Sequence, residues 1–197
     1  MDSTDFKIIR ELQEDGRKKF SKIGQAVGLS RVAVAVRVKR LVESKNVRIH
    51  PEINLKSQNM IMALILIESA DEKKRENILS LYSGCPRVIL FGTAYGHYDI
   101  FALVFAENSS LLEILLTSCM LKNIEGINKS SIMIIGDLLV PSFLPVKKYL
   151  ADKTSTVAPC GLDCSKCDKF RRQLCIACPS TSLYKGEFFN LNKRKSG

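Results

Sequence analysis

Five of the chain's seven cysteines fall close together near its C-terminus, within the stretch CGLDCSKCDKFRRQLCIACP. They follow the pattern C-x3-C-x2-C-x7-C-x2-C, with thiols at Cys160, Cys164, Cys167, Cys175 and Cys178. Two C-x2-C pairs can each chelate one side of a tetrahedral zinc ion. Four-thiolate sets also hold iron–sulfur clusters, and a spare thiol suits a redox switch. The spacing therefore predicts zinc first, a [4Fe–4S] cluster as the alternative, and a metal-free thiol switch third.

The rest of the sequence favours metal binding over disulfide formation. The N-terminal residues MDSTDFK are acidic and polar, unlike a secretory signal, and the longest apolar run, Met60–Ile67, is too short to span a bilayer. We therefore expect a soluble cytoplasmic protein, in which clustered cysteines are more often metal ligands than disulfides. A polar, basic segment of this size cannot fold by burial alone, so we expect residues 159–197 to be a Cys-rich metal-binding module with a basic tail.

Residues 1–56 carry the pattern of three helices. The first, TDFKIIRELQEDG, has Thr4 as its expected N-cap and Gly16 as its stop. The second, FSKIGQAVGLS, closes at Gly28, and the third begins at the capping residue Ser30. Two short helices joined by a tight glycine turn predict a helix-turn-helix DNA-binding domain over residues 1–56.

The third helix has two distinct faces when its residues are placed 100° apart. Val34, Arg37, Val38 and Leu41 share the face that we expect to be buried. The opposite face is apolar at first and then basic, which suits thymine methyl groups and phosphates in a major groove. A valine-rich core helix buried all round is the alternative. The predicted DNA-contacting residues are Ser30, Arg31, Val32, Ala35, Val36, Arg37, Lys39 and Arg40.

In residues 57–136 the spacing of apolar residues changes: continuous apolar runs typical of buried strands occur between helical segments. The predicted order is β-α-β-β-α-β, a ferredoxin-like arrangement in which two helices cover one face of four antiparallel strands. The opposite sheet face is also apolar, so we expect a homodimer or higher homo-oligomer that pairs sheets. Cys85 and Cys119 are expected to be small core residues. Residues 137–158, which contain two prolines, are the predicted linker, and the fold class is α+β.

The net charge of +10 is divided unevenly along the chain. Residues 1–56 carry 13 basic and 7 acidic residues, and residues 141–197 carry 11 and 4, whereas residues 57–140 carry 6 and 9. Basic ends that flank an acidic middle indicate a polyanionic partner, and double-stranded DNA fits the predicted helix-turn-helix.

About two-thirds of the chain resembles the Lrp/AsnC (leucine-responsive/asparagine regulator) family of transcription factors. The resemblance runs through TDFKIIRELQEDGR, IGQAVGLS, RVKRLVES and GHYD, in the family's order and spacing. It implies a winged helix-turn-helix, a ferredoxin-like domain that forms dimers, and a pocket for a small effector such as an amino acid. The effector-loop residues that it implies are Gly92, Gly96, His97, Tyr98 and Asp99.

The chain departs from the family pattern on and after the third helix. Ala35 and Val36 replace polar or charged residues, so we expect A·T-rich sites and shape readout. Lys45 replaces the usual glycine, and we expect Asn46 to supply the left-handed cap.

The predicted function is sequence-specific transcription regulation, modulated by a small effector and by the metal- or redox-sensitive cysteines. The alternative is a tetrapyrrole-binding enzyme of the sirohaem decarboxylase type, which has a similar two-domain shape. Such an enzyme needs histidines in its pocket, and the chain has only His50 and His97. We therefore predict a regulator rather than an enzyme.

Overall fold

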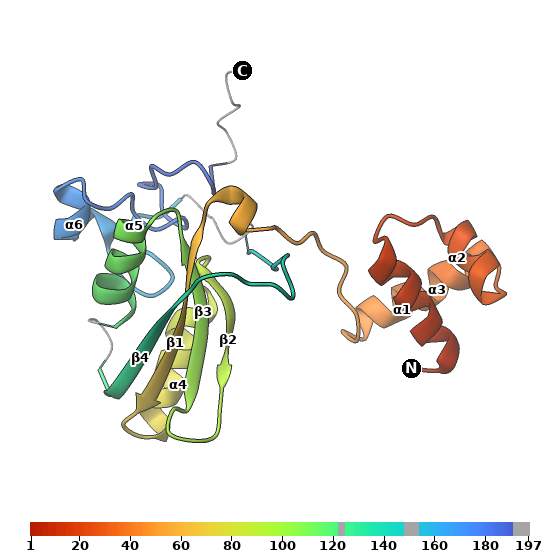
Figure 1. Ribbon diagram of the computed structural model, residues 1–197, viewed down its shortest axis with the longest axis horizontal. Coiled ribbons are helices and arrows are strands. Elements are labelled where there is room, and N and C mark those ends of the chain that lie inside the picture. The colour runs from red at the N-terminus through yellow and green to blue at the C-terminus, as the bar shows by residue number, and fades with distance from the viewer. Residues whose placement is uncertain (122–124, 148–153, 191–197) are drawn as a thin grey trace, which may run out of the picture. The chain divides into compact units, whose positions relative to one another are not determined.

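A computed structural model describes residues 1–121, 125–147 and 154–190 (Figure 1). The chain divides into two compact units, Met1–Pro51 and Glu52–Gly197. The predicted basic tail, residues 191–197, and residues 148–153 of the predicted linker lie outside the described residues. Within the described ranges, none of the helices combines the length and the apolar character needed to cross a bilayer.

The first unit consists of three helices: α1 (Ser3–Glu14), α2 (Phe20–Val27) and α3 (Arg31–Glu43). Their apolar faces meet in a small core that contains Ile8, Ile23, Val34 and Val38. The turn between α2 and α3 depends on glycine. Gly28 has a left-handed φ of 74°, and a Cβ on Gly24 would lie 2.4 Å from the carbonyl oxygen of Leu29. The predicted helix-turn-helix is therefore present.

Three local details of this unit differ from the sequence predictions. Asp2, rather than Thr4, is the N-cap of α1, because it forms a reciprocal capping box with Asp5. Lys45 itself adopts the left-handed conformation, with a φ of 58°, so Asn46 is not the cap. The wing expected from the family resemblance is not formed by the described residues 44–51, which contain no strand.

The second unit contains a four-stranded antiparallel sheet with the strand order β2-β3-β1-β4. The chain order β-α-β-β-α-β confirms the predicted ferredoxin-like topology. The elements are η1 (Lys56–Gln58), β1 (Ile61–Ser69), α4 (Glu72–Ser83), β2 (Val88–Thr93), β3 (Ile100–Ala106), α5 (Ser109–Ile114), η2 (Leu115–Met120) and β4 (Ile127–Ile135). Two short helical turns follow near the C-terminus, η4 (Cys164–Lys166) and α6 (Asp168–Arg171).

The main core lies between the sheet and the helix layer of α4, α5 and η2 (Figure 1). Alternate residues of β1, namely Ala63, Ile65 and Ile67, point into this core, as the period of a strand requires. Their partners on β3, including Ala102 and Val104, are also fully buried. The segment predicted as one helix after β3 is an α-helix that continues as a π-helix, η2.

The other sheet face is partly covered by the chain's own C-terminal segment. Met62, Leu103 and Phe105 on this face pack against Tyr184 and Phe189 in a second core. Phe105 stacks on Phe189 at a ring-centroid distance of 5.9 Å. Part of the sheet face that was expected to pair with a second copy is therefore covered within the chain, by aromatic residues beyond the cysteines.

Candidate functional sites

Helix α3 presents the surface that the sequence predicted for DNA. The Ser30 hydroxyl caps the helix by accepting a hydrogen bond from the Ala33 amide at 3.1 Å. Val32 and Val36 are 71% and 62% exposed, whereas Val34 and Val38 are buried. Because Val32 and Val36 are exposed, α3 is not buried all round, and the alternative of a valine-rich core helix is excluded. Exposed apolar side chains of this kind are typical of a binding surface. The DNA contacts themselves stay a prediction.

Two of the predicted DNA-contacting arginines are held by the start of α1. Arg37 Nη1 lies 2.7 Å from Asp2 Oδ2 and 2.8 Å from Asp5 Oδ1, and Arg40 Nη2 lies 2.9 Å from Asp5 Oδ2. The hydrogen bond from Arg37, with that from the Asp5 amide, lowers the pKa of Asp2 to about 2. Arg31 and Lys39 are exposed on the same helix as Val36. These two residues are better placed for phosphates than Arg37.

The predicted effector loop joins β2 to β3. Gly92 is crowded, since a Cβ there would lie 2.9 Å from the ring of Phe101, and Gly96 has a φ of 146°. The carboxylate of Asp99 accepts hydrogen bonds from the Ser69 amide, at 2.8 Å, and from the Ser69 hydroxyl. Asp99 thus ties the start of β3 to the end of β1. The side chain of His97 is exposed, and Tyr98 is half-buried.

All seven cysteines of the chain line one cavity of about 540 Å³. Five come from the described part of the predicted module, residues 159–190, which we call the cysteine module. The other two, Cys85 and Cys119, come from the end of α4 and from η2. Both also pack against the main core, as expected, but the prediction missed their place in the cavity wall. Nothing in the local sequence indicates that these two residues lie opposite the module.

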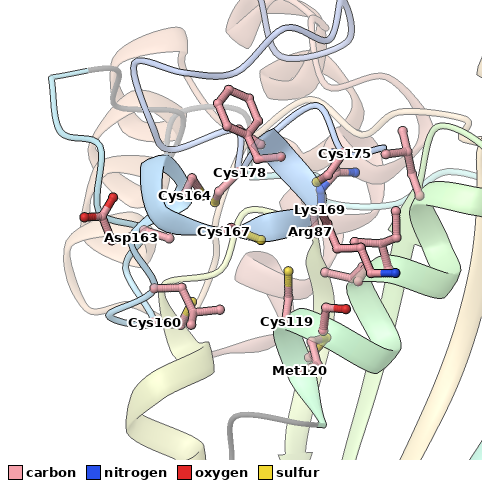
Figure 2. Close-up of a pocket in the computed structure, with 18 of the residues that line it drawn as sticks. Arg87, Cys119, Met120, Cys160, Asp163, Cys164, Cys167, Lys169, Cys175 and Cys178 are labelled. Carbon is pink, nitrogen blue, oxygen red and sulfur yellow. The ribbon is translucent and has the colours of Figure 1, made fainter. Parts of the chain in front are cut away.

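The thiols surround the cavity rather than meeting at one point (Figure 2). Within the described ranges, no group of three or more Cys, His, Asp or Glu side chains is positioned to hold a metal ion. The wall is otherwise largely apolar, with Tyr82, Leu111 and Leu115 from the helix layer. Neither of the chain's two histidines is among the residues that line this cavity, so the cavity lacks the side chains of the tetrapyrrole alternative.

The backbone of the cysteine module adopts uncommon conformations next to its thiols. Gly161 and Ala177 have φ values of 82° and 66°, and Gln173 has 59°. Left-handed conformations of non-glycine residues cost free energy and cluster at ligand sites. The Lys185 amide donates to the Ile176 carbonyl at 2.9 Å and so holds the loop between Cys175 and Cys178. The backbone of the loop between Cys175 and Cys178 is therefore held in one conformation by this hydrogen bond.

Burial controls the protonation of these thiols. It raises the pKa of Cys178 to about 12 and raises the pKa values of Cys164 and Cys175 above the usual range. The same cause raises the pKa of Cys119, and the neighbouring thiol of Cys175 adds to it. These four thiols are therefore protonated at neutral pH when no cation is bound. A bound metal displaces these protons.

A buried ion pair beside β2 and β3 is the point at which Tyr184 fastens the cysteine module to the sheet. Arg87 Nη1 and Nη2 lie 2.5 Å and 3.0 Å from the two carboxylate oxygens of Glu107, and both side chains are largely buried. The Tyr184 hydroxyl donates to Glu107 Oε1 at 2.6 Å. Arg87 also lines the cavity. The same side chain therefore contacts both the cavity and the Glu107 carboxylate that binds Tyr184. The module and the sheet consequently form one packed unit.

Comparisons with known proteins agree with the fold and the helix-turn-helix. The AsnC-type helix-turn-helix domain matches residues 1–42. An uncharacterized HTH-type transcriptional regulator of Pyrococcus furiosus is 31% identical over 140 residues, covering 68% of this chain and 91% of the relative. The regulator Ptr1 of Methanocaldococcus jannaschii is 29% identical over 109 residues, covering 55% of this chain and 74% of the relative.

Solved structures of the same kind share the fold. Escherichia coli AsnC superposes with a TM-score of 0.60 at 20% identity, covering 70% of this chain and 93% of AsnC. The leucine response regulatory protein of Mycobacterium tuberculosis gives a TM-score of 0.63 at 24% identity, covering 72% and 97%. Together with the exposed face of α3 and the ferredoxin-like sheet, these matches show that the chain belongs to the Lrp/AsnC family of helix-turn-helix transcriptional regulators.

Proposed function

We propose that this regulator binds DNA through α3 and that a thiolate-held metal centre in the cysteine cavity controls its DNA affinity. The observation that carries the proposal is the collection of seven thiols around one cavity, in the same compact unit as the sheet. Free cysteines can pack as small apolar residues, but their distinctive chemistry is oxidation and metal binding, and seven thiols around one cavity supply a full set of metal ligands. A centre held there could stabilise the module, which has little core of its own.

The size of the cavity favours a cluster over a single ion. A zinc ion needs four thiolates at about 2.3 Å, so its ligands must crowd around one point. An iron–sulfur cluster is itself several atoms across and is held by four cysteines that stand apart. A volume of about 540 Å³ with thiols on opposite walls suits the cluster. Side-chain rotation from the wall would bring the ligating thiols inward. Zinc remains the competing occupant.

The chain's own residues suit an anionic centre. Lys166, Lys169 and Arg172 line the cavity and would offset the negative charge of four thiolates. The apolar wall excludes water and would protect the centre from hydrolysis and stray oxidants. When bound, such a cluster supplies a redox- and oxygen-sensitive group to the regulator. Arg87, Glu107 and Tyr184 would transmit a change in the module to the ends of β2 and β3.

DNA binding by α3 needs two copies of the chain, because family proteins of this type read two half-sites. Exposed apolar residues on the edge strand β4 support assembly: Ile132, Met133 and Ile134 are 40%, 45% and 60% exposed. We propose a homodimer or a higher homo-oligomer that buries them. Light scattering of the purified protein would measure this. A monomer at micromolar concentration would contradict it.

A metabolite effector is the second proposed input. It is supported by the anchored loop between β2 and β3, whose Tyr95 and His97 side chains are exposed while Asp99 is fixed to Ser69. A related structure from Neisseria meningitidis is a complex with L-methionine, at 21% identity and a TM-score of 0.61. Calorimetric titration of amino acids into wild-type protein and a His97→Ala variant tests it. Equal binding in the two proteins would contradict a role for His97.

The central experiment measures metal and DNA binding in the same sample. Protein is purified without oxygen, and its iron, sulfide and zinc contents and visible spectrum are recorded. DNA affinity is then measured by fluorescence anisotropy on a duplex selected from a random pool, for loaded, air-oxidised and chelator-stripped protein. We expect at least about a tenfold difference in Kd between loaded and stripped protein, a typical allosteric coupling.

A double variant, Cys164→Ser with Cys167→Ser, is the control for this experiment. It should bind DNA with an affinity that does not respond to chelator, because its module cannot load. Equal Kd values for loaded and stripped wild-type protein would refute metal control. One zinc per chain with no visible band would instead identify zinc as the occupant and leave the cluster contradicted.

A further inference from the structure

Cys119 is a thiol on the sheet side of the cavity, opposite the cysteine module. It lies on η2, in the helix layer of the ferredoxin-like domain, and its side chain points across the cavity toward Cys167 (Figure 2). The module cysteines Cys160, Cys164, Cys167 and Cys175 line the same cavity as Cys119. Cys119 therefore packs against the main core on one side and lines the cavity on the other.

The backbone around Cys119 is fixed in an unusual geometry. Residues Leu115–Met120 form a π-helical turn, and such turns occur frequently at functional sites. The Tyr82 hydroxyl lies 3.1 Å from the carbonyl oxygens of both Cys119 and Met120. Tyr82 itself is buried and lines the same cavity. These contacts hold the Cα of Cys119 in place, so its thiol has a restricted set of directions, all next to the cavity.

We propose that Cys119 is a ligand of the metal centre, so that the centre bridges the ferredoxin-like domain and the cysteine module. The inference rests on the proposed function, because it assigns a further ligand to the same cavity. The remaining thiolates would come from the module cysteines that Cys119 faces. Ligation forms a bond between the Cys119 sulfur and the metal, and the thiol proton passes to water. No oxidant or reductant is needed for that step.

This assignment gives the centre a direct mechanical connection to the regulatory domain. A module that ligated the metal alone could gain or lose it with little effect on the sheet. A ligand on η2 makes metal loss a change in the helix layer that packs on β1 and β3. The metal would thereby act on the domain through which Lrp/AsnC-type regulators of this topology assemble.

Cys85 provides a matched control within the same cavity wall. Burial raises the pKa of the Cys85 thiol, and the side chain packs against the main core. The backbone next to Cys85 is closely packed, since a Cβ on Gly84 would lie 3.3 Å from the Cβ of Pro159. We therefore expect Cys85 to remain packed in the cavity wall and not to bind the metal. Cys119→Ser and Cys85→Ser make the same chemical change at two cavity positions.

The first test uses wild-type protein, so it does not depend on a variant that folds. Loaded and chelator-stripped protein are treated with a pulse of iodoacetamide, and the modification of each cysteine is quantified by mass spectrometry. We expect Cys119 to react at least about tenfold faster after stripping, whereas Cys85 reacts at a similar rate in both states. An unchanged Cys119 rate, or the same change at Cys85, would overturn the assignment.

The second test compares the variants after reconstitution with iron and sulfide, and separately with zinc. Cys119→Ser should lose metal to a chelator at least about tenfold faster than wild-type protein, a penalty at the low end for altered metal shells. Cys85→Ser should match wild type. Wild-type protein that retains neither metal overturns this inference together with the proposed function. Metal retention that is equal in wild type and Cys119→Ser overturns this inference alone.

Discussion

The Tyr184 hydroxyl fastens the cysteine module to the sheet, and removing it tests whether the two form one cooperative unit. It donates to Glu107 Oε1 at 2.6 Å, in a pocket where Tyr184 is 7% exposed. Tyr184→Phe keeps the ring packed edge-on against Phe189, at a centroid distance of 6.1 Å. The substitution removes the hydrogen bond to the Glu107 carboxylate, and such bonds contribute about 1.5–3 kcal/mol.

Glu107→Gln should cost more than Tyr184→Phe, for a reason that the structure supplies. It leaves the guanidinium of Arg87, which is 6% exposed, without a counter-charge. Breaking a buried ion pair in this way typically costs about 3–5 kcal/mol. Burial opposes ionisation of Glu107, but the charge of Arg87 and the hydrogen bonds outweigh it and lower its pKa. The pair therefore stabilises the fold above the ordinary glutamate range, and this stabilisation is lost as the pH falls through the lowered pKa.

The assay is urea unfolding followed by tyrosine fluorescence. The chain has no tryptophan, and its five tyrosines all lie between residues 82 and 184, so the signal reports on the second unit. Tyr95→Phe is the control, because the Tyr95 side chain is fully exposed and the chemical change is identical. We expect less than about 0.5 kcal/mol for the control. A Tyr184→Phe cost equal to that of the control, or a Glu107→Gln cost no larger than that of Tyr184→Phe, would refute this account.

Three further predictions concern other parts of the chain. Phe189→Ala should lower the free energy of unfolding of the second unit by about 3–5 kcal/mol, since its side chain is fully buried, and a loss below about 1 kcal/mol in urea titration would contradict that packing. Lys39→Ala should reduce the slope of log K against log salt by about 0.9, as expected for one lost phosphate contact, while Lys7→Ala, exposed on α1, should leave the slope unchanged. The Asp2 carboxylate should stabilise the first unit at neutral pH, and this stabilisation should be lost as the pH falls below the ordinary aspartate range toward about 2. The reason is that the hydrogen bond from Arg37 lowers the pKa of Asp2. Circular dichroism of wild type and Asp2→Asn across that range measures it, and identical acid profiles would count against the Arg37 contact.

Local sequence patterns were sufficient to predict the helices and strands and the faces that they bury. The periods of α3 and β1 placed Val34, Val38, Ile65 and Ile67 in the core, because helix and strand geometry fix which residues share a face. Glycine at position 28 and serine at position 30 marked the helix ends for the same local reason. Short-range errors arose where two residues could serve one role, as with Asp2 and Thr4 at the start of α1.

Contacts between distant segments could not be predicted in this way. The pairing of Arg37 and Arg40 with Asp5 holds two residues that were predicted to contact DNA. The covering of Phe105 by Phe189 fills a sheet face that strand periodicity alone left open. Neither contact has a local signature, because residues more than 30 positions apart meet only after the chain folds.

The sequence by itself determined that the chain has a helix-turn-helix, a ferredoxin-like domain and a cluster of five closely spaced thiols, since each depends on residue types at short separations. Only the tertiary structure decided that Cys85 and Cys119 join those thiols around one cavity. It also decided that Arg87, Glu107 and Tyr184 fasten the module to the sheet. The physical reason is that a cavity wall is formed by whichever surfaces pack against each other, and that packing is set by the burial of the whole unit rather than by any one segment.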